Sequence, residues 1–163
     1  MAKARDVEGL DPQGSFAEAA ARVVAVRGAE LLDHREGVLD MNDIERVHAM
    51  RVASRRLRAV LEIFAPAFDP GLHKGVLRDV KAIAGALGER RDPDVQLDHF
   101  QALRERLSPD DHEGVDVVLD QIQARQAAGN ETLSAALDEL EGADLPSRLD
   151  ALVASAWTEE PRP

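Results

Sequence analysis

The sequence predicts an all-α fold, a helical bundle of about five to six helices. The hydrophobic share of its 163 residues is 44% but the aromatic share is only 3%, so Leu, Val, Ile and Ala must form the core. Signals for helix starts recur along the chain, and no alternating strand pattern competes with them. This length suits one domain. We expect residues 1–14 to be a flexible N-terminus, residues 15–157 a single helical domain and residues 158–163 a frayed tail.

The first two helices are each predicted by a capping box, in which two side chains satisfy the free N–H groups of a helix start. Ser15 and Glu18 form the first box and predict a helix over residues 16–35. Asn42 and Glu45 form a weaker second box. The helix that it opens should end ahead of the prolines in "APAFDP".

The next stretch is predicted to contain two helices with a stop between them. Asp69 caps the third helix with Pro70 at its first position, and Gly88 is its expected end. Asp92 and Pro93 then start a fourth helix, because proline suits a first turn and not a helix interior. Apolar residues at spacings of three and four support both helices: Val76, Val80, Ile83 and Leu87, then Val95, Leu97, Phe100, Leu103 and Leu107.

Two more helices complete the expected bundle. Residues 111–140 have the apolar periodicity of one long helix, and the sequence leaves open whether Gly129-Asn130 breaks it. The stretch "LPSRLDALVASAW" predicts a short amphipathic helix that ends at Trp157.

Charge is distributed unevenly along the chain. The net charge is −11, which disfavours general binding of nucleic acid because an acidic protein repels phosphate chains. Residues 46–91 nevertheless hold ten Lys or Arg against four Asp or Glu, a local balance of +6 that leaves −17 for the remainder. An anion site is therefore predicted within this segment.

Two cationic stripes follow from helical geometry. On a helix that turns 100° per residue, four side chains of "VHAMRVASRRLR" fall within a sector of about 80°: His48, Arg51, Arg55 and Arg58. Arg56 points toward the opposite border of the apolar face. In the third helix, one face carries Lys74, Arg78 and Lys81. If the two helices are neighbours, these like charges crowd together at an energetic cost unless an anion compensates.

The alternative interpretation is that the stripes are solvated faces paired with acidic residues elsewhere. Residues 47–58 weaken this alternative, because no acidic residue within them is spaced to partner the arginines. Glu62 is expected to reach only Arg58.

The residues needed for most catalytic and metal sites are missing. The chain has no Cys, no GxSxG elbow and no Gly-rich phosphate loop, and its five histidines never pair at i,i+4. Asp92 and Asp94 resemble paired catalytic carboxylates, but Pro93 between them favours helix capping. We expect that the protein is not an enzyme and that it binds neither a metal ion nor a cofactor.

A cytoplasmic location is expected from what the sequence lacks. No apolar run approaches the roughly 18 residues of a membrane span, and no apolar stretch follows the basic residues at the N-terminus. The absence of Cys fits a reducing compartment.

The basic segment also carries a family resemblance. "VHAMRVASRRLRAVLEIF" followed by "VKAIAGALGERRDPDV" resembles the two motifs of the CHAD family, the conserved histidine α-helical domain, in the family's order. "IQARQAAGNETLSAAL" resembles the long helix that follows, so the similarity spans roughly residues 16–157. The resemblance implies a CHAD-like all-α fold in which basic residues of packed helices line a channel for inorganic polyphosphate. It further implies association with polyphosphate granules.

The family's binding residues carry over by motif position. The first motif supplies His48, Arg51, Arg55, Arg56 and Arg58, and the second supplies the cation Lys81 and the Arg-Asp pair Arg91 and Asp92. Helical geometry alone adds Lys74 and Arg78 to the expected polyphosphate site.

The chain departs from the family in one respect. Family members commonly have two related helical halves, whereas no second His/Arg motif follows Arg91 here. The chain therefore resembles a first four-helix-bundle half plus extra helices. Either a second copy completes the fold as a homodimer, with the Trp157-ended helix as a candidate contact, or polyphosphate binds an open, weaker surface.

Two other functions compete with polyphosphate binding. A non-catalytic adaptor or scaffold could dock an acidic protein partner on the basic stripe. Single-stranded nucleic acid is disfavoured because it needs aromatic stacking, and Phe64 and Phe68 are better explained as core residues.

Overall fold

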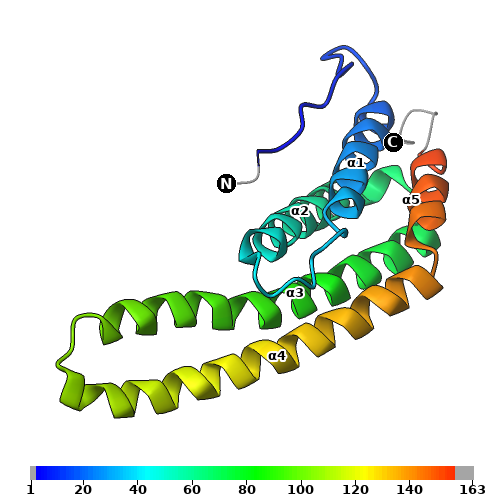
Figure 1. The fold of residues 1–163 in the computed structure, drawn as a ribbon. Coiled ribbons are helices and arrows are strands. Elements are labelled where there is room, and N and C mark those ends of the chain that lie inside the picture. The colour runs from blue at the N-terminus through cyan, green and yellow to red at the C-terminus, as the bar shows by residue number, and fades with distance from the viewer. Residues whose placement is uncertain (1–2, 157–163) are drawn as a thin grey trace.

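The computed structural model describes residues 3–156, which form helices joined by short loops and contain no strand (Figure 1). The helices are α1 (Phe16–Asp33), α2 (Ile44–Ile63), α3 (Pro70–Arg104), α4 (His112–Gly142) and α5 (Leu145–Ala154). Short 3-10 turns, Ala65–Ala67 and Pro109–Asp111, come just before α3 and α4. The predicted all-α class is confirmed.

The starts of α1 and α2 differ in how well the sequence predicted them. The first capping box is present: the Ser15 hydroxyl accepts from the Glu18 N–H at 3.1 Å, and the Glu18 carboxylate accepts from the Ser15 N–H at 3.2 Å. The box predicted at Asn42 is wrong. The backbone N–H of Asn42 donates to the carboxylate of Asp40 at 2.9 Å, and Asp43, without a side-chain cap, precedes α2.

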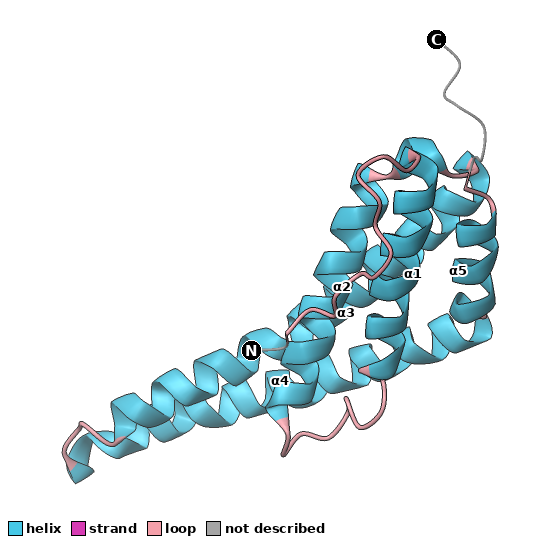
Figure 2. Cartoon of the chain, turned by 90° about the horizontal axis from the view of Figure 1, so that it is seen from above, coloured by secondary structure: helices cyan, strands magenta, loops and turns pink. Residues whose placement is uncertain are grey.

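The predicted division of α3 is also wrong. One helix of 35 residues runs through Gly88, and Asp92 is an exposed helical residue instead of a cap. Pro93 lies buried inside the helix, where it removes one backbone hydrogen bond. Long-range packing overrides these local stop signals, because α3 and α4 run side by side as a long hairpin (Figures 1 and 2).

The two helices are in close contact at Gly129, where α4 continues unbroken and so settles the question that the sequence left open. A Cβ atom at Gly129 would lie 3.0 Å from the carbonyl oxygen of Glu89 and 3.1 Å from the Cα of Arg90. Glu89 carries the carbonyl that Pro93 leaves without its helical N–H donor. Glycine thus lets α4 pack directly on the backbone of α3 at that point.

Gly129→Ala is expected to destabilise the protein by about 2 kcal/mol, because the new methyl group would meet rigid backbone. Urea unfolding followed by circular dichroism measures the change. Gly114→Ala, on the same helix with nothing within 4 Å of its Cβ position, should be neutral or stabilising. Equal stability of the two variants would contradict the close approach.

The helices form one main core and one smaller apolar cluster. α1, α2 and α5 pack against one end of the α3–α4 hairpin, and its turn end projects beyond them (Figures 1 and 2). All five helices contribute to the main core, with Val24, Leu57, Ile83, Leu133 and Leu149 among its buried residues. A smaller cluster of Leu97, Leu119 and Ile122 holds the projecting part together.

The two ends of the domain pack on α1. Leu145, Leu149 and Leu152 of α5 are buried in the main core, so the apolar face of this helix is used within the chain. Trp157 and the expected tail 158–163 lie outside the described residues. Near the other end, the Arg5 backbone N–H donates to the Glu30 carboxylate at 2.5 Å. None of the helices within residues 3–156 combines the length and apolarity needed to cross a bilayer.

Candidate functional site

The cationic residues of α2 lie on the two borders of its buried face. Arg56 belongs to the border that faces α1. There, burial of Glu30 opposes ionisation, but the Arg5 backbone N–H, the Arg27 guanidinium and the charge of Arg56 together hold the pKa of Glu30 below its usual value. Arg56 therefore serves the α1–α2 contact.

The opposite border of α2 faces α3, and there the predicted cations of the two helices meet. The Glu62 carboxylate oxygen Oε1 accepts from Arg58 Nε at 3.1 Å and lies 3.2 Å from Lys81 Nζ. The expectation that Glu62 reaches only Arg58 is wrong, because the antiparallel packing of α3 brings Lys81 to the same oxygen. We call the cations on this border the cationic strip: His48, Arg51, Arg55, Arg58 and Lys81.

The rest of the cationic strip has no acidic neighbour in the part of the chain that the structure describes. Within residues 3–156, no carboxylate lies within ion-pair distance of His48, Arg51 or Arg55. Arg55 is exposed and the other two are half-buried. Arg51 and Arg55 are four residues apart on one helix, so their like charges repel each other.

Glu62 is the counter-charge of the strip. Hydrogen bonds from Arg58 and then Lys81 hold the pKa of its carboxyl below the usual value. It is therefore ionised at neutral pH.

Among residues 3–156, the two residues added from helical geometry, Lys74 and Arg78, do not join Lys81 in its ion pair with Glu62. Arg78 Nε donates to the Asp79 carboxylate at 3.0 Å, and Asp79 also forms an ion pair with Arg148 of α5. Arg78 thus shares Asp79 with Arg148, and its side chain is 76% exposed. Lys74 is exposed, and no carboxylate of residues 3–156 forms an ion pair with it.

The side chain of Arg91 contacts a buried polar network between α3 and α4 and does not lie on the open surface. Its Nη1 is 3.8 Å from Oδ2 of Asp94, while Asp92, the next residue in the family motif, is exposed. Asp94 Oδ1 accepts from Arg90 Nη1 at 2.5 Å and from Gln126 Nε2 at 2.6 Å. Sequence reasoning missed this network, although Arg90 and Asp94 have the i,i+4 spacing of a helical ion pair.

Asn130 extends the buried network toward the loop before α2. Its Oδ1 accepts from Arg90 Nε at 3.1 Å, and its Nδ2 donates to the carbonyl oxygen of Leu39 at 3.2 Å. The hydrogen bonds of Asn130 with Arg90 and Leu39 therefore connect α3, α4 and the α1–α2 loop.

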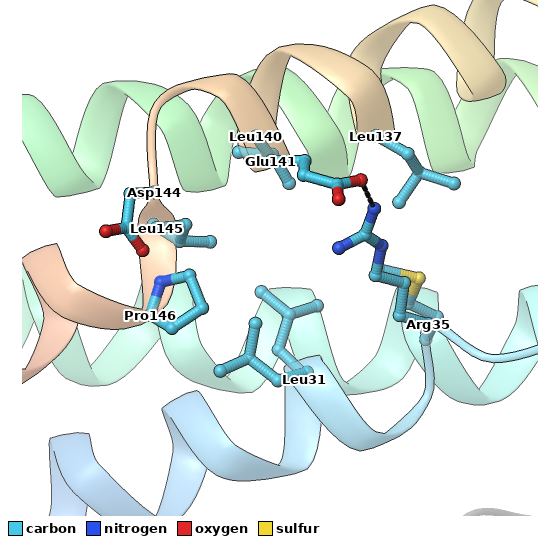
Figure 3. Close-up of a pocket in the computed structure, with 10 residues that line it drawn as sticks. Leu31, Arg35, Leu137, Leu140, Glu141, Asp144, Leu145 and Pro146 are labelled. Atoms are coloured by element: carbon cyan, nitrogen blue, oxygen red, sulfur yellow. Dashed lines mark hydrogen bonds and ion pairs between the residues drawn. The ribbon is translucent and has the colours of Figure 1, made fainter.

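Two hollows in the described part of the chain lie away from the cationic strip. One of about 250 Å³ opens between the end of α1, α2, the end of α4 and the start of α5, and half of its ten lining residues are leucines (Figure 3). An ion pair between Arg35 and Glu141 lies on one side of it. A second hollow of about 170 Å³ shares Arg35 and Leu137 with the first. No residue of the strip lines either hollow.

Over residues 3–156, no three His, Asp or Glu side chains gather closely enough to hold a metal ion.

Comparison with known proteins covers the two basic motifs that contain the residues of the strip. No curated protein matches the chain. A family model of the CHAD domain matches residues 22–163, a range that holds most of α1, all of α2 to α5 and both basic motifs. Because this match covers far more than half of the sequence, the chain belongs to the CHAD family.

Proposed function

We propose that this protein binds inorganic polyphosphate along the cationic strip and catalyses no reaction. One observation carries the proposal: Arg51 and Arg55 follow one border of α2 without a carboxylate partner within residues 3–156, and the same border continues to Arg58 and Lys81. The family is commonly linked to polyphosphate binding, which agrees with this assignment.

The chemistry of the strip suits a linear polyanion. Guanidinium groups stay charged and can grip two phosphate oxygens at once, and Lys81 adds a point charge. Cations spaced three or four residues apart rise by about 4.5–6 Å along a helix, so an extended chain on α2 meets a new guanidinium at each helical turn. His48 would strengthen binding when protonated.

The remaining predicted residues receive different roles in this proposal. Lys74, exposed before Lys81 on α3, would contact a chain that extends beyond the strip. Arg56, Arg78 and Arg91 already have acidic neighbours, and we assign them to structural support.

The position of the strip favours polyphosphate binding on an open surface over binding in a channel between two copies. Its cations are exposed or half-buried along one α2–α3 pair, and none of them lines either of the two hollows described above. A single copy could therefore bind a chain. Light scattering with and without polyphosphate tests the homodimer, because a channel between two copies requires a doubled mass.

Thermal melting at low salt tests the proposed function. Long-chain polyphosphate should raise Tm, and monophosphate at the same phosphate concentration should not, because only a chain engages several cations at once. If five phosphates are neutralised, the affinity should fall with salt with a log–log slope of about −3.5. No shift at low salt would favour an adaptor for acidic proteins. Displacement of polyphosphate by RNA would favour nucleic acid.

A further inference from the structure

Glu62 is the carboxylate that touches the cationic strip in the described part of the chain. One of its oxygens takes a hydrogen bond from Arg58 on its own helix and an ion pair from Lys81 on the neighbouring helix, at 3.1 and 3.2 Å. The side chains of Glu62, Arg58 and Lys81 are 42%, 49% and 47% exposed. The carboxylate can therefore rotate into water without disturbing the core.

An anion that reaches this end of the strip must compete with Glu62. Phosphate oxygens and the carboxylate need the same N–H donors of Arg58 and Lys81, and the two negative groups repel each other. The end near Glu62 thus carries two cations and one anion, whereas Arg51 and Arg55 have no such counter-charge within residues 3–156.

We propose that Glu62 is a built-in counter-ion that sets the affinity of the strip and the shortest polyanion able to use all of it. It occupies Arg58 and Lys81 when no ligand is bound. A chain long enough to hold Arg51 and Arg55 as well gains the additional contacts that displace the carboxylate, and a short anion does not. This inference rests on the proposed function.

A supporting role for Glu62 would predict the opposite change in polyphosphate affinity. If Glu62 serves to hold Arg58 and Lys81 in a binding-ready position, its removal weakens binding, because two flexible side chains must then be ordered by the ligand. The sign of the change in affinity decides between the two roles.

Glu62→Gln tests the inference, because glutamine keeps the size and helix preference of the residue and removes its charge. Titration with long-chain polyphosphate at low salt should show binding about tenfold tighter than wild type. Shorter chains should also bind detectably, and the salt slope should steepen by about 0.7 for each further phosphate neutralised.

Asp116→Asn is the matched control. It removes the same charge and breaks a comparable exposed ion pair, that of Asp116 with Arg104 at the projecting end of the hairpin. When both variants are compared at about 0.15 M salt, where the Debye length is about 8 Å, the affinity of Asp116→Asn should stay within about twofold of wild type, because exposed charges farther apart than this length are screened.

The outcomes separate the inference from the proposed function. Tighter binding by Glu62→Gln alone supports the counter-ion role. Unchanged or weaker binding by Glu62→Gln, with a wild-type chain that binds, overturns this inference and leaves the proposed function standing. Equal tightening by Asp116→Asn also overturns it, since net charge would then explain the effect. A wild-type chain that does not bind polyphosphate overturns both.

Discussion

Arg51→Ala combined with Arg55→Ala is expected to weaken the binding of long-chain polyphosphate about 30- to 150-fold at low salt. Each guanidinium offers charge-assisted hydrogen bonds, and on a partly solvated surface the two together contribute about 2–3 kcal/mol. These arginines lie at the centre of the cationic strip, between His48 and Arg58, so their loss interrupts the path of a bound chain. Isothermal titration with polyphosphate of defined length measures the change.

The same double variant should fold as well as wild type. Arg51 and Arg55 make no ion pair within residues 3–156, and Arg55 is exposed. Alanine favours helix, and removing two like charges at i,i+4 relieves repulsion. The Tm without ligand should therefore be unchanged or slightly higher. Loss of the helical circular-dichroism signal would instead show that these residues are structural.

A matched double variant separates site binding from net charge. Arg106→Ala with Arg125→Ala also removes two exposed arginines, which lie on the hairpin formed by α3 and α4. When both double variants are compared at about 0.15 M salt, where the Debye length is about 8 Å, the polyphosphate affinity of this one should stay within about threefold of wild type, because screening limits the reach of exposed charges. An equal loss in both double variants would contradict a localised site.

The helices could be predicted from sequence where their signals are local. The capping box of Ser15 and Glu18 lies within one turn and formed as expected. Gly88 and Pro93 are also local signals, but their prediction failed because the packing of α4 along α3 outweighs one lost hydrogen bond. Gly129 was ambiguous for the same reason, since a glycine that breaks a helix and one that admits a neighbouring backbone look alike in sequence.

The candidate site, too, could be predicted only where its geometry depends on residues near one another in the sequence. The position of Arg51 and Arg55 on one border of α2 follows from helical periodicity alone. The meeting of Arg58 and Lys81 at Glu62 depends on how α2 and α3 pack, and the pairing of Asp79 with Arg148 depends on where α5 returns to the bundle. Sequence spacing contains neither fact.

Asp94→Ala is expected to destabilise the protein by about 3–5 kcal/mol, the largest single effect on stability that the structure predicts. The side chains of Asp94 and Arg90 are 0% exposed, and Asp94 Oδ1 accepts from both Arg90 and Gln126. Without the carboxylate, the Arg90 guanidinium stays charged inside the protein, because arginine does not lose its proton. Urea unfolding should show the loss as a lower midpoint with an unchanged slope.

The charge of the buried pair, and not the volume lost, is the reason for this expectation. Arg90→Met combined with Asp94→Leu removes both charges and keeps most of the volume, so it should be more stable than Asp94→Ala alone. Asp116→Ala breaks an exposed ion pair and should cost less than about 1 kcal/mol. If the double variant unfolds as easily as Asp94→Ala, the unpaired charge of Arg90 is not the cause. Packing around Asn130 and Gly129 would then determine the stability of the α3–α4 contact.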